Sequence, residues 1–116
     1  QTFKAVCYFE GSVGGLNIGA PVVFRGVRIG SVKDVILRFE TIKLTFVIPV
    51  YVEIEPDKIQ AVGPVPQTPG QNLKAFIDRG LRASLETQSI VTGQLQVALD
   101  FYPDKPALQI ALVGRP

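Results

Sequence analysis

The chain has 116 residues, a formal net charge of +2, and 47% hydrophobic residues against 19% charged ones. This length corresponds to one domain, and the composition excludes an intrinsically disordered chain. The longest apolar run covers residues 46–52, which is far shorter than the roughly 20 residues of a membrane-spanning helix.

The residue types that usually carry chemistry are scarce. The chain has no histidine and one cysteine, Cys7, which removes most metal sites and every catalytic arrangement with a histidine base. The basic residues are scattered, without the cluster typical of a nucleic-acid-binding protein. Arg25 and Arg28 could bind a phosphate, but two arginines on a strand bend are more typical of solvated or ion-paired side chains. We therefore expect no enzyme activity, no cofactor, no metal and no nucleic-acid partner.

Residues 2–9 predict the first strand, because every second side chain is apolar. The apolar face consists of Phe3, Ala5, Cys7 and Phe9. Cys7 is expected to be a small buried core residue. The following segment, residues 10–30, holds six of the 11 glycines. Its spacing matches neither a dinucleotide-binding fingerprint nor a P-loop, so it predicts turns and bulges.

Strand segments are predicted at 22–24 and 27–39, with bends or bulges at Gly26 and Gly30. The clearest strand is 43–54, which has one continuous apolar face. That face consists of Leu44, Phe46, Ile48, Val50, Val52 and Ile54.

The opposite face of the 43–54 strand is partly apolar, at Val47, Pro49 and Tyr51. A strand that is apolar on both faces is covered on both, by the same chain or by another subunit. Pro49 cannot donate a ladder hydrogen bond and therefore predicts an edge or a bulge.

Residues 61–70 contain three prolines and predict a loop. A short helix is predicted over 69–79, with Thr68 as its N-cap and Gly80 as its C-terminal stop. Its apolar face consists of Leu73, Phe76 and Ile77.

The last third of the chain predicts strands at 81–86 and 95–101 around a polar turn at 87–94. Six or seven short strands and one helix indicate a small β-sandwich or barrel. We assign residues 1–106 to a single domain. Residues 107–116 are expected to form a C-terminal extension that begins a further segment, although 108–113 could also add a short strand.

The turn at 87–94 places two apolar residues, Ile90 and Val91, side by side at the crest of a polar loop. Each side chain gains about 1.5–3 kcal/mol from leaving water. Two interpretations are open. Either one of the pair folds under the loop into the core, or both are buried in an assembly or around an apolar ligand.

Two segments of the chain resemble the MCE domain family, in particular its MlaD and PqiB type. The first is FEGSVGGLNIGAPVVFRGVRIGSV at 9–32, and the second is LRASLETQSIVTGQLQVALDF at 81–101. The resemblance covers about residues 3–104, and the glycine-spaced first motif is its specific part.

The resemblance implies a mainly β fold, a small seven-stranded β-barrel with one short helix, that assembles into a homohexameric ring. Such rings lie in the periplasm of Gram-negative bacteria and are tethered to the inner membrane by an anchor outside this chain. They carry phospholipids or other hydrophobic molecules between the inner and outer membranes, often with an ABC transporter permease. An adhesion module of the cell envelope that acts at host cells is the alternative.

The resemblance also implies where the functional residues lie. The family's pore loop corresponds to 87–94, so an apolar pore is expected to be lined by Ile90 and Val91, with Ser89 and Thr92 beside them. The 43–54 strand, which is apolar on one face and partly apolar on the other, is expected to supply subunit contacts through Val47, Pro49 and Tyr51.

Overall fold

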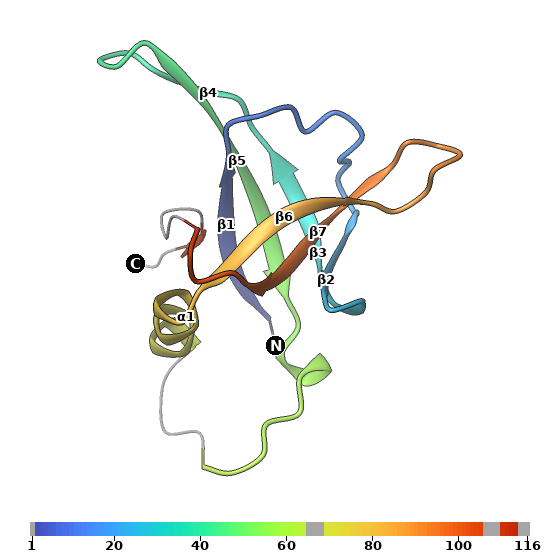
Figure 1. Cartoon of the computed structure of the whole chain (residues 1–116), viewed down its shortest axis with the longest axis vertical. Helices are drawn as coiled ribbons and strands as arrows, with labels where there is room; N and C mark the ends of the chain where they lie inside the picture. The colour runs from blue at the N-terminus through green and yellow to red at the C-terminus, as the bar shows by residue number, and fades with distance from the viewer. Residues whose placement is uncertain (1, 65–68, 106–109, 114–116) are drawn as a thin grey trace.

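The computed structural model describes residues 2–64, 69–105 and 110–113, and its strands curl into a barrel-like sheet with one α-helix beside it (Figure 1). The elements are β1 (Phe3–Phe9), β2 (Pro21–Phe24), β3 (Val27–Val35), β4 (Arg38–Glu40), β5 (Thr45–Ile54), the 3-10 turn η1 (Pro56–Lys58), α1 (Pro69–Asp78), β6 (Leu81–Thr87), β7 (Leu95–Phe101) and β8 (Ile110–Leu112). The predicted mainly β fold with one short helix is confirmed.

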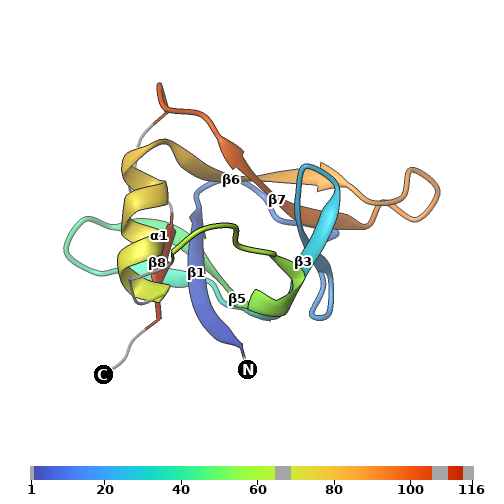
Figure 2. The same cartoon turned by 90° about the horizontal axis from the view of Figure 1, so that it is seen from below.

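The sheet closes almost completely around its core. The strand order is β6-β7-β2-β3-β5-β1-β8, with β4 paired to β5. The β2–β7 pair is parallel and the other pairs are antiparallel. The helix α1 contacts both β6 and β8, the two edge strands, and so lies across the remaining gap (Figure 2). This arrangement confirms the barrel.

The inward faces of the strands form one apolar core. Its fully buried side chains include Val22, Val32, Val50, Val52 and Val97. The alternation predicted in β1 is confirmed, because Ala5 and Cys7 lie in the core and Phe3 and Phe9 pack against it. Cys7 is only 1% exposed, and burial raises the pKa of its thiol to about 12.

The glycine-rich segment forms the turns that its composition predicts. Arg25 and Gly26 connect β2 to β3 with φ angles of 51° and 86°, the left-handed conformation that a two-residue hairpin turn requires. Arg25 is ion-paired, because its Nε donates to Asp100 Oδ1 at 3.0 Å. Its guanidinium also lies 5.0 Å from the centre of the Phe24 ring. The ion-paired interpretation is confirmed for Arg25.

Pro49 does not mark an edge, because β5 lies between β1 on one side and β3 with β4 on the other. The amide of Ile36 donates to the Pro49 carbonyl at 3.1 Å, and a proline has no N–H to return that bond. The ladder is therefore interrupted between Val35 and Arg38, while the pairs on both sides keep one register. The predicted strand 27–39 is thus divided into β3 and β4 opposite this proline.

The end of α1 agrees with the prediction from the sequence, and the last strand extends the predicted domain. Gly80 ends α1 with a φ of 108°, and its amide donates to the Ile77 carbonyl at 3.0 Å, as predicted. Thr68, the predicted N-cap, lies outside the described residues. The strand β8, which the prediction placed in the extension 107–116, pairs with β1, and Ile110 is buried in the core.

Candidate functional site

The β6–β7 hairpin projects from the barrel and ends in the loop 88–94 (Figure 1). The Gln88 amide donates to the Gln94 carbonyl at 2.7 Å, and the Gly93 amide donates to the Ser89 carbonyl at 2.9 Å. The Ser89 hydroxyl accepts from the Thr92 amide at 3.3 Å. The Thr92 hydroxyl accepts from the Gln94 amide at 3.3 Å. The loop is therefore a closed turn that holds its own shape.

Ile90 and Val91 occupy the crest of this turn and are 92% and 95% exposed. The interpretation in which one of them folds into the core is wrong for the isolated chain. Neither side chain contributes to the barrel's stability through burial. Two adjacent, fully wetted apolar side chains on a hydrogen-bonded frame are well placed to contact an apolar molecule or another copy of the chain.

The glycine-rich motif supports the base of this loop, a contact that sequence reasoning did not anticipate. The Leu95 amide donates to the Gly15 carbonyl at 2.8 Å. Gly15 has a φ of 95°, and a Cβ at this position would collide with the Gly93 carbonyl oxygen. The two segments that carry the resemblance, 9–32 and 81–101, thus meet in space at the foot of the loop.

The predicted subunit-contact residues on β5 are partly covered by the chain itself. Val47 and Tyr51 are half-buried, whereas Pro49 is fully buried. Arg38 lies over this face: its Nη2 donates to the Tyr51 hydroxyl at 3.3 Å, and its guanidinium is 5.9 Å from the ring centre of Tyr8, the cross-strand neighbour of Pro49. The available surface here is therefore Val47 and Tyr51, without Pro49.

The hairpin of β4 and β5 is a second projection, on the opposite side of the barrel from the β6–β7 hairpin (Figures 1 and 2). Its apolar side chains are exposed, with Leu44 at 73% and Phe46 at 58%. The chain itself therefore does not cover this part of the predicted apolar face, and cover by another subunit stays a prediction. Leu44 lies in the turn before β5, with a φ of 55°, so the predicted strand begins two residues later than 43. Phe46 pairs with Phe39 in the hairpin, outside the core cluster.

Two rings make the β4–β5 hairpin an aromatic surface. Phe39 and Phe46 are cross-strand partners, and their ring centres are 5.0 Å apart. Ile42 stands at the tip, almost fully exposed. Alternation predicted that Phe46 shares a face with Ile48 and Val50, but it carried no signal that the hairpin leaves the barrel.

Within residues 2–64, 69–105 and 110–113, no three of the His, Cys, Asp and Glu side chains are grouped to hold a metal ion. None of the helices in the same described ranges is both long and apolar enough to span a membrane.

The chain was compared with models of known protein families. A family model described as MlaD protein matches residues 4–102. The match covers most of β1 and extends through β7. It includes both the glycine-rich segment and the loop with Ile90 and Val91.

Proposed function

The chain belongs to the MlaD family of MCE domains, and from this membership we propose that it is a non-enzymatic subunit of a lipid-conducting ring. The family is related to lipid transport. In the proposed ring, copies of this domain surround a central apolar pore that binds phospholipids or other hydrophobic molecules and conducts them between the inner and outer membranes. The ring is proposed to be a homohexamer in the periplasm, anchored to the inner membrane from outside this chain and associated with an ABC transporter permease.

The observation that carries this proposal is the pair of exposed side chains at the crest of the β6–β7 loop. Ile90 and Val91 face water in the single chain, although burial would stabilise each by about 1.5–3 kcal/mol. In a ring whose loops converge on the symmetry axis, the copies of this pair form an apolar collar. The hydroxyls of Ser89 and Thr92 accept hydrogen bonds that brace the turn and so hold the collar in place.

The energetics of moving a lipid through water favour such a collar. A phospholipid has roughly 30 methylenes, and exposing each to water costs about 0.8 kcal/mol, so the unshielded molecule costs more than roughly 20 kcal/mol. A ring of apolar side chains removes much of this cost without any reacting group. This requirement agrees with a chain that has no histidine and one buried cysteine.

One observation favours the alternative, an interaction module of the cell envelope. The β4–β5 hairpin exposes Phe39, Phe46 and Ile42, and aromatic residues are enriched in protein interfaces. On this alternative the hairpin is the functional surface and the β6–β7 loop is not.

The test is photo-crosslinking to lipid in membranes that contain the assembled protein. A photoreactive residue at position 90 or 91 is expected to label lipid, whereas one at position 62 is not. Val62 is the matched control, because it is 93% exposed and apolar but lies far from the loop in the chain. Native mass spectrometry of the assembled protein is expected to give a hexamer.

Two outcomes would argue against the ring. Equal labelling at positions 62 and 90 would mean that the loop has no specific contact with lipid. The second outcome compares two double variants. If Phe39→Ser with Phe46→Ser abolishes lipid transport while Ile90→Asn with Val91→Asn leaves it unchanged, the interaction module is the better description.

A further inference from the structure

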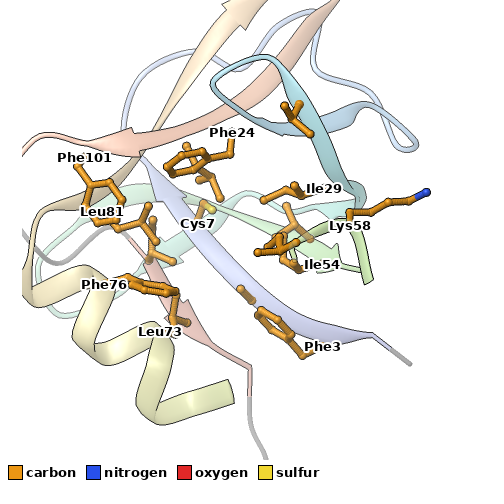
Figure 3. A pocket seen from close by; sticks show the side chains of 16 residues that line it. Phe3, Cys7, Phe24, Ile29, Ile54, Lys58, Leu73, Phe76, Leu81 and Phe101 are labelled. Atoms are coloured by element: carbon orange, nitrogen blue, oxygen red, sulfur yellow. The ribbon is translucent and has the colours of Figure 1, made fainter. Parts of the chain in front are cut away.

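A cavity of about 350 Å³ lies at one end of the barrel, between the ends of the strands, η1 and α1 (Figure 3). Phenylalanines from four elements stand around it: Phe3 of β1, Phe24 of β2, Phe76 of α1 and Phe101 of β7. The cavity is separate from the β6–β7 loop, none of whose residues line it.

Small side chains on β1 leave part of the barrel interior unfilled. The β1 residues that line it include Ala5 and Cys7, whose side chains are too small to fill the space between the phenylalanines. Phe24 and Phe76 each contact Phe101 edge to face, with ring centres 5.9 and 6.3 Å apart. These contacts hold the aromatic wall in position and keep the space open.

The rim of the cavity is apolar and exposed to water. Val27, the first residue of β3, is 58% exposed, and Ile59, which follows η1, is 52% exposed. Exposed apolar side chains around an apolar hollow are typical of a binding site rather than of a filled core.

The walls determine what the cavity can bind. Of the described residues that line it, all except Lys58 have apolar side chains or, at Cys7, a thiol. That thiol is neutral at physiological pH, because burial raises its pKa to about 12. A hydroxyl, amide or charge inside would lose its hydrogen bonds to water without replacement. The buried part of a ligand must therefore be hydrocarbon.

The volume limits this hydrocarbon to one chain. A methylene is similar in size to a water molecule, whose share of liquid volume is about 30 Å³, so 350 Å³ holds roughly 12 chain carbons. The two chains of a phospholipid, with roughly 30 methylenes, need more than twice this space.

Lys58 supplies the only charge among the described lining residues. Its stem lies at the rim and its ammonium group points away from the cavity (Figure 3). No ion pair joins Lys58 to another residue of the described ranges. Because Lys58 is exposed and its four-carbon stem is flexible, the ammonium group can turn toward an anionic group at the mouth of the cavity.

We propose that this end of the barrel binds a single-chain anionic amphiphile of the fatty-acid class, with the acyl chain in the cavity and the carboxylate at Lys58. The site lies within one copy of the domain, so it does not depend on ring assembly. A negative result for this cavity would therefore not count against the proposed pore.

The experiment is a titration of the isotope-labelled 116-residue chain with dodecanoate, followed by NMR at concentrations below micelle formation. We expect saturable shifts at residues that line the cavity and none in the loop 88–94. Dodecanol, which has the same chain and no charge, is the matched ligand. A phospholipid with two long chains is expected not to compete for the site.

Two pairs of variants locate the binding. Val27→Trp is expected to block the mouth and weaken dodecanoate binding at least tenfold. Ile18→Trp, at a position that is 69% exposed and outside the cavity lining, is expected to leave it unchanged. Lys58→Gln is expected to weaken dodecanoate binding about two- to fivefold, the range of an exposed ion pair, and to leave dodecanol binding unchanged. Lys43→Gln, on the β4–β5 hairpin, is the charge-matched control.

Thermal unfolding checks that each variant folds, and Ile59→Trp closes the mouth from its other side if Val27→Trp lowers the Tm. An absence of saturable shifts with dodecanoate would overturn the proposal. Equal dodecanoate affinity of the parent chain and the Val27→Trp and Ile59→Trp variants would also overturn it, because the ligand would then bind elsewhere. A Lys58→Gln variant with unchanged dodecanoate affinity would overturn the assignment of the carboxylate.

Discussion

The backbone of Gly15 lies directly against the carbonyl oxygen of Gly93, so closely that a side chain at position 15 has no space. The contact joins the glycine-rich segment after β1 to the foot of the β6–β7 loop, far along the chain. The hydrogen bond from the Leu95 amide to the Gly15 carbonyl lies beside it. The position of the exposed pair Ile90 and Val91 thus depends on a residue in the N-terminal motif.

Gly15→Ala is expected to destabilise the protein by about 2 kcal/mol or more, because it combines a left-handed backbone with a collision. Gly19→Ala is the control, since Gly19 has a φ of 92° and no atom within 4 Å of the added Cβ. It should cost about 1–2 kcal/mol through the backbone conformation alone. Urea denaturation measures both. Equal costs would show that the Gly15–Gly93 contact adds nothing.

Gly30→Ala tests the packing of β3 against β5. The Cβ would collide with the Glu53 carbonyl oxygen, while the φ of Gly30 lies outside the left-handed region, so the cost is steric. Overpacking of this kind typically costs about 1–3 kcal/mol. Gly11→Ala, with no atom within 4 Å, should stay within about 0.5 kcal/mol of the parent. A Gly30→Ala protein as stable as Gly11→Ala would contradict this account.

Ile90→Asn with Val91→Asn tests the loop crest. Because both side chains are almost fully exposed, each substitution should change the free energy of unfolding by no more than about 0.5 kcal/mol. Lipid transport should fall, because polar amides in an apolar collar disfavour contact with acyl chains. Val62→Asn is the control for an exposed valine elsewhere. Normal transport by the double variant would exclude the pore assignment, and its unfolding would mean that the pair supports the core.

Because Cys7 is buried, the free energy of unfolding is expected to fall as the pH becomes alkaline. The unfolded thiol ionises near its ordinary pKa of 9.0, whereas burial holds the folded value at about 12. The contribution of Cys7 is therefore complete below pH 9 and is lost as the pH rises toward 12, because only the unfolded chain releases the proton. Chemical denaturation across this range should show a steeper loss for the parent than for Cys7→Ala. Parallel curves would contradict the buried thiol.

The same burial predicts slow chemistry at this thiol. At neutral pH the folded chain should react with iodoacetamide much more slowly than the chain in denaturant, because the thiolate is the nucleophile. Rapid modification of the native protein would mean that the end of the barrel opens easily.

Much of the fold could be predicted because its signals are local. Alternation in β1 and β7 records which side of the strand meets the core, and each residue's face depends only on its position along the strand. Gly80 ends α1 because glycine accepts the left-handed backbone at little cost. The exposed pair at 90 and 91 was identified as an anomaly for the same reason, since apolar residues at a polar turn stand out in the sequence.

The extent of burial was decided by the tertiary structure. Phe46 and Val50 share one face of β5 and have the same alternation, yet Phe46 is exposed and Val50 is fully buried. The alternation does not record where the strand leaves the barrel and loses its opposite wall. Pro49 predicted an edge or a bulge. It lies instead in an inner strand, and its missing N–H faces the break in pairing that separates β3 from β4.

The contact between Gly15 and Gly93 and the cavity beside α1 also arise only in the folded chain. Each depends on the space between segments that are distant in the sequence. There is no room for a side chain at Gly15, whereas the space beside Ala5 and Cys7 is not filled. The sequence alone determined the periodicity of the strands, the helix end and the unusual loop. Only the tertiary structure decided that Gly15 supports the base of that loop and that one end of the barrel contains a cavity. Packing depends on two opposed surfaces and cannot be read from one strand.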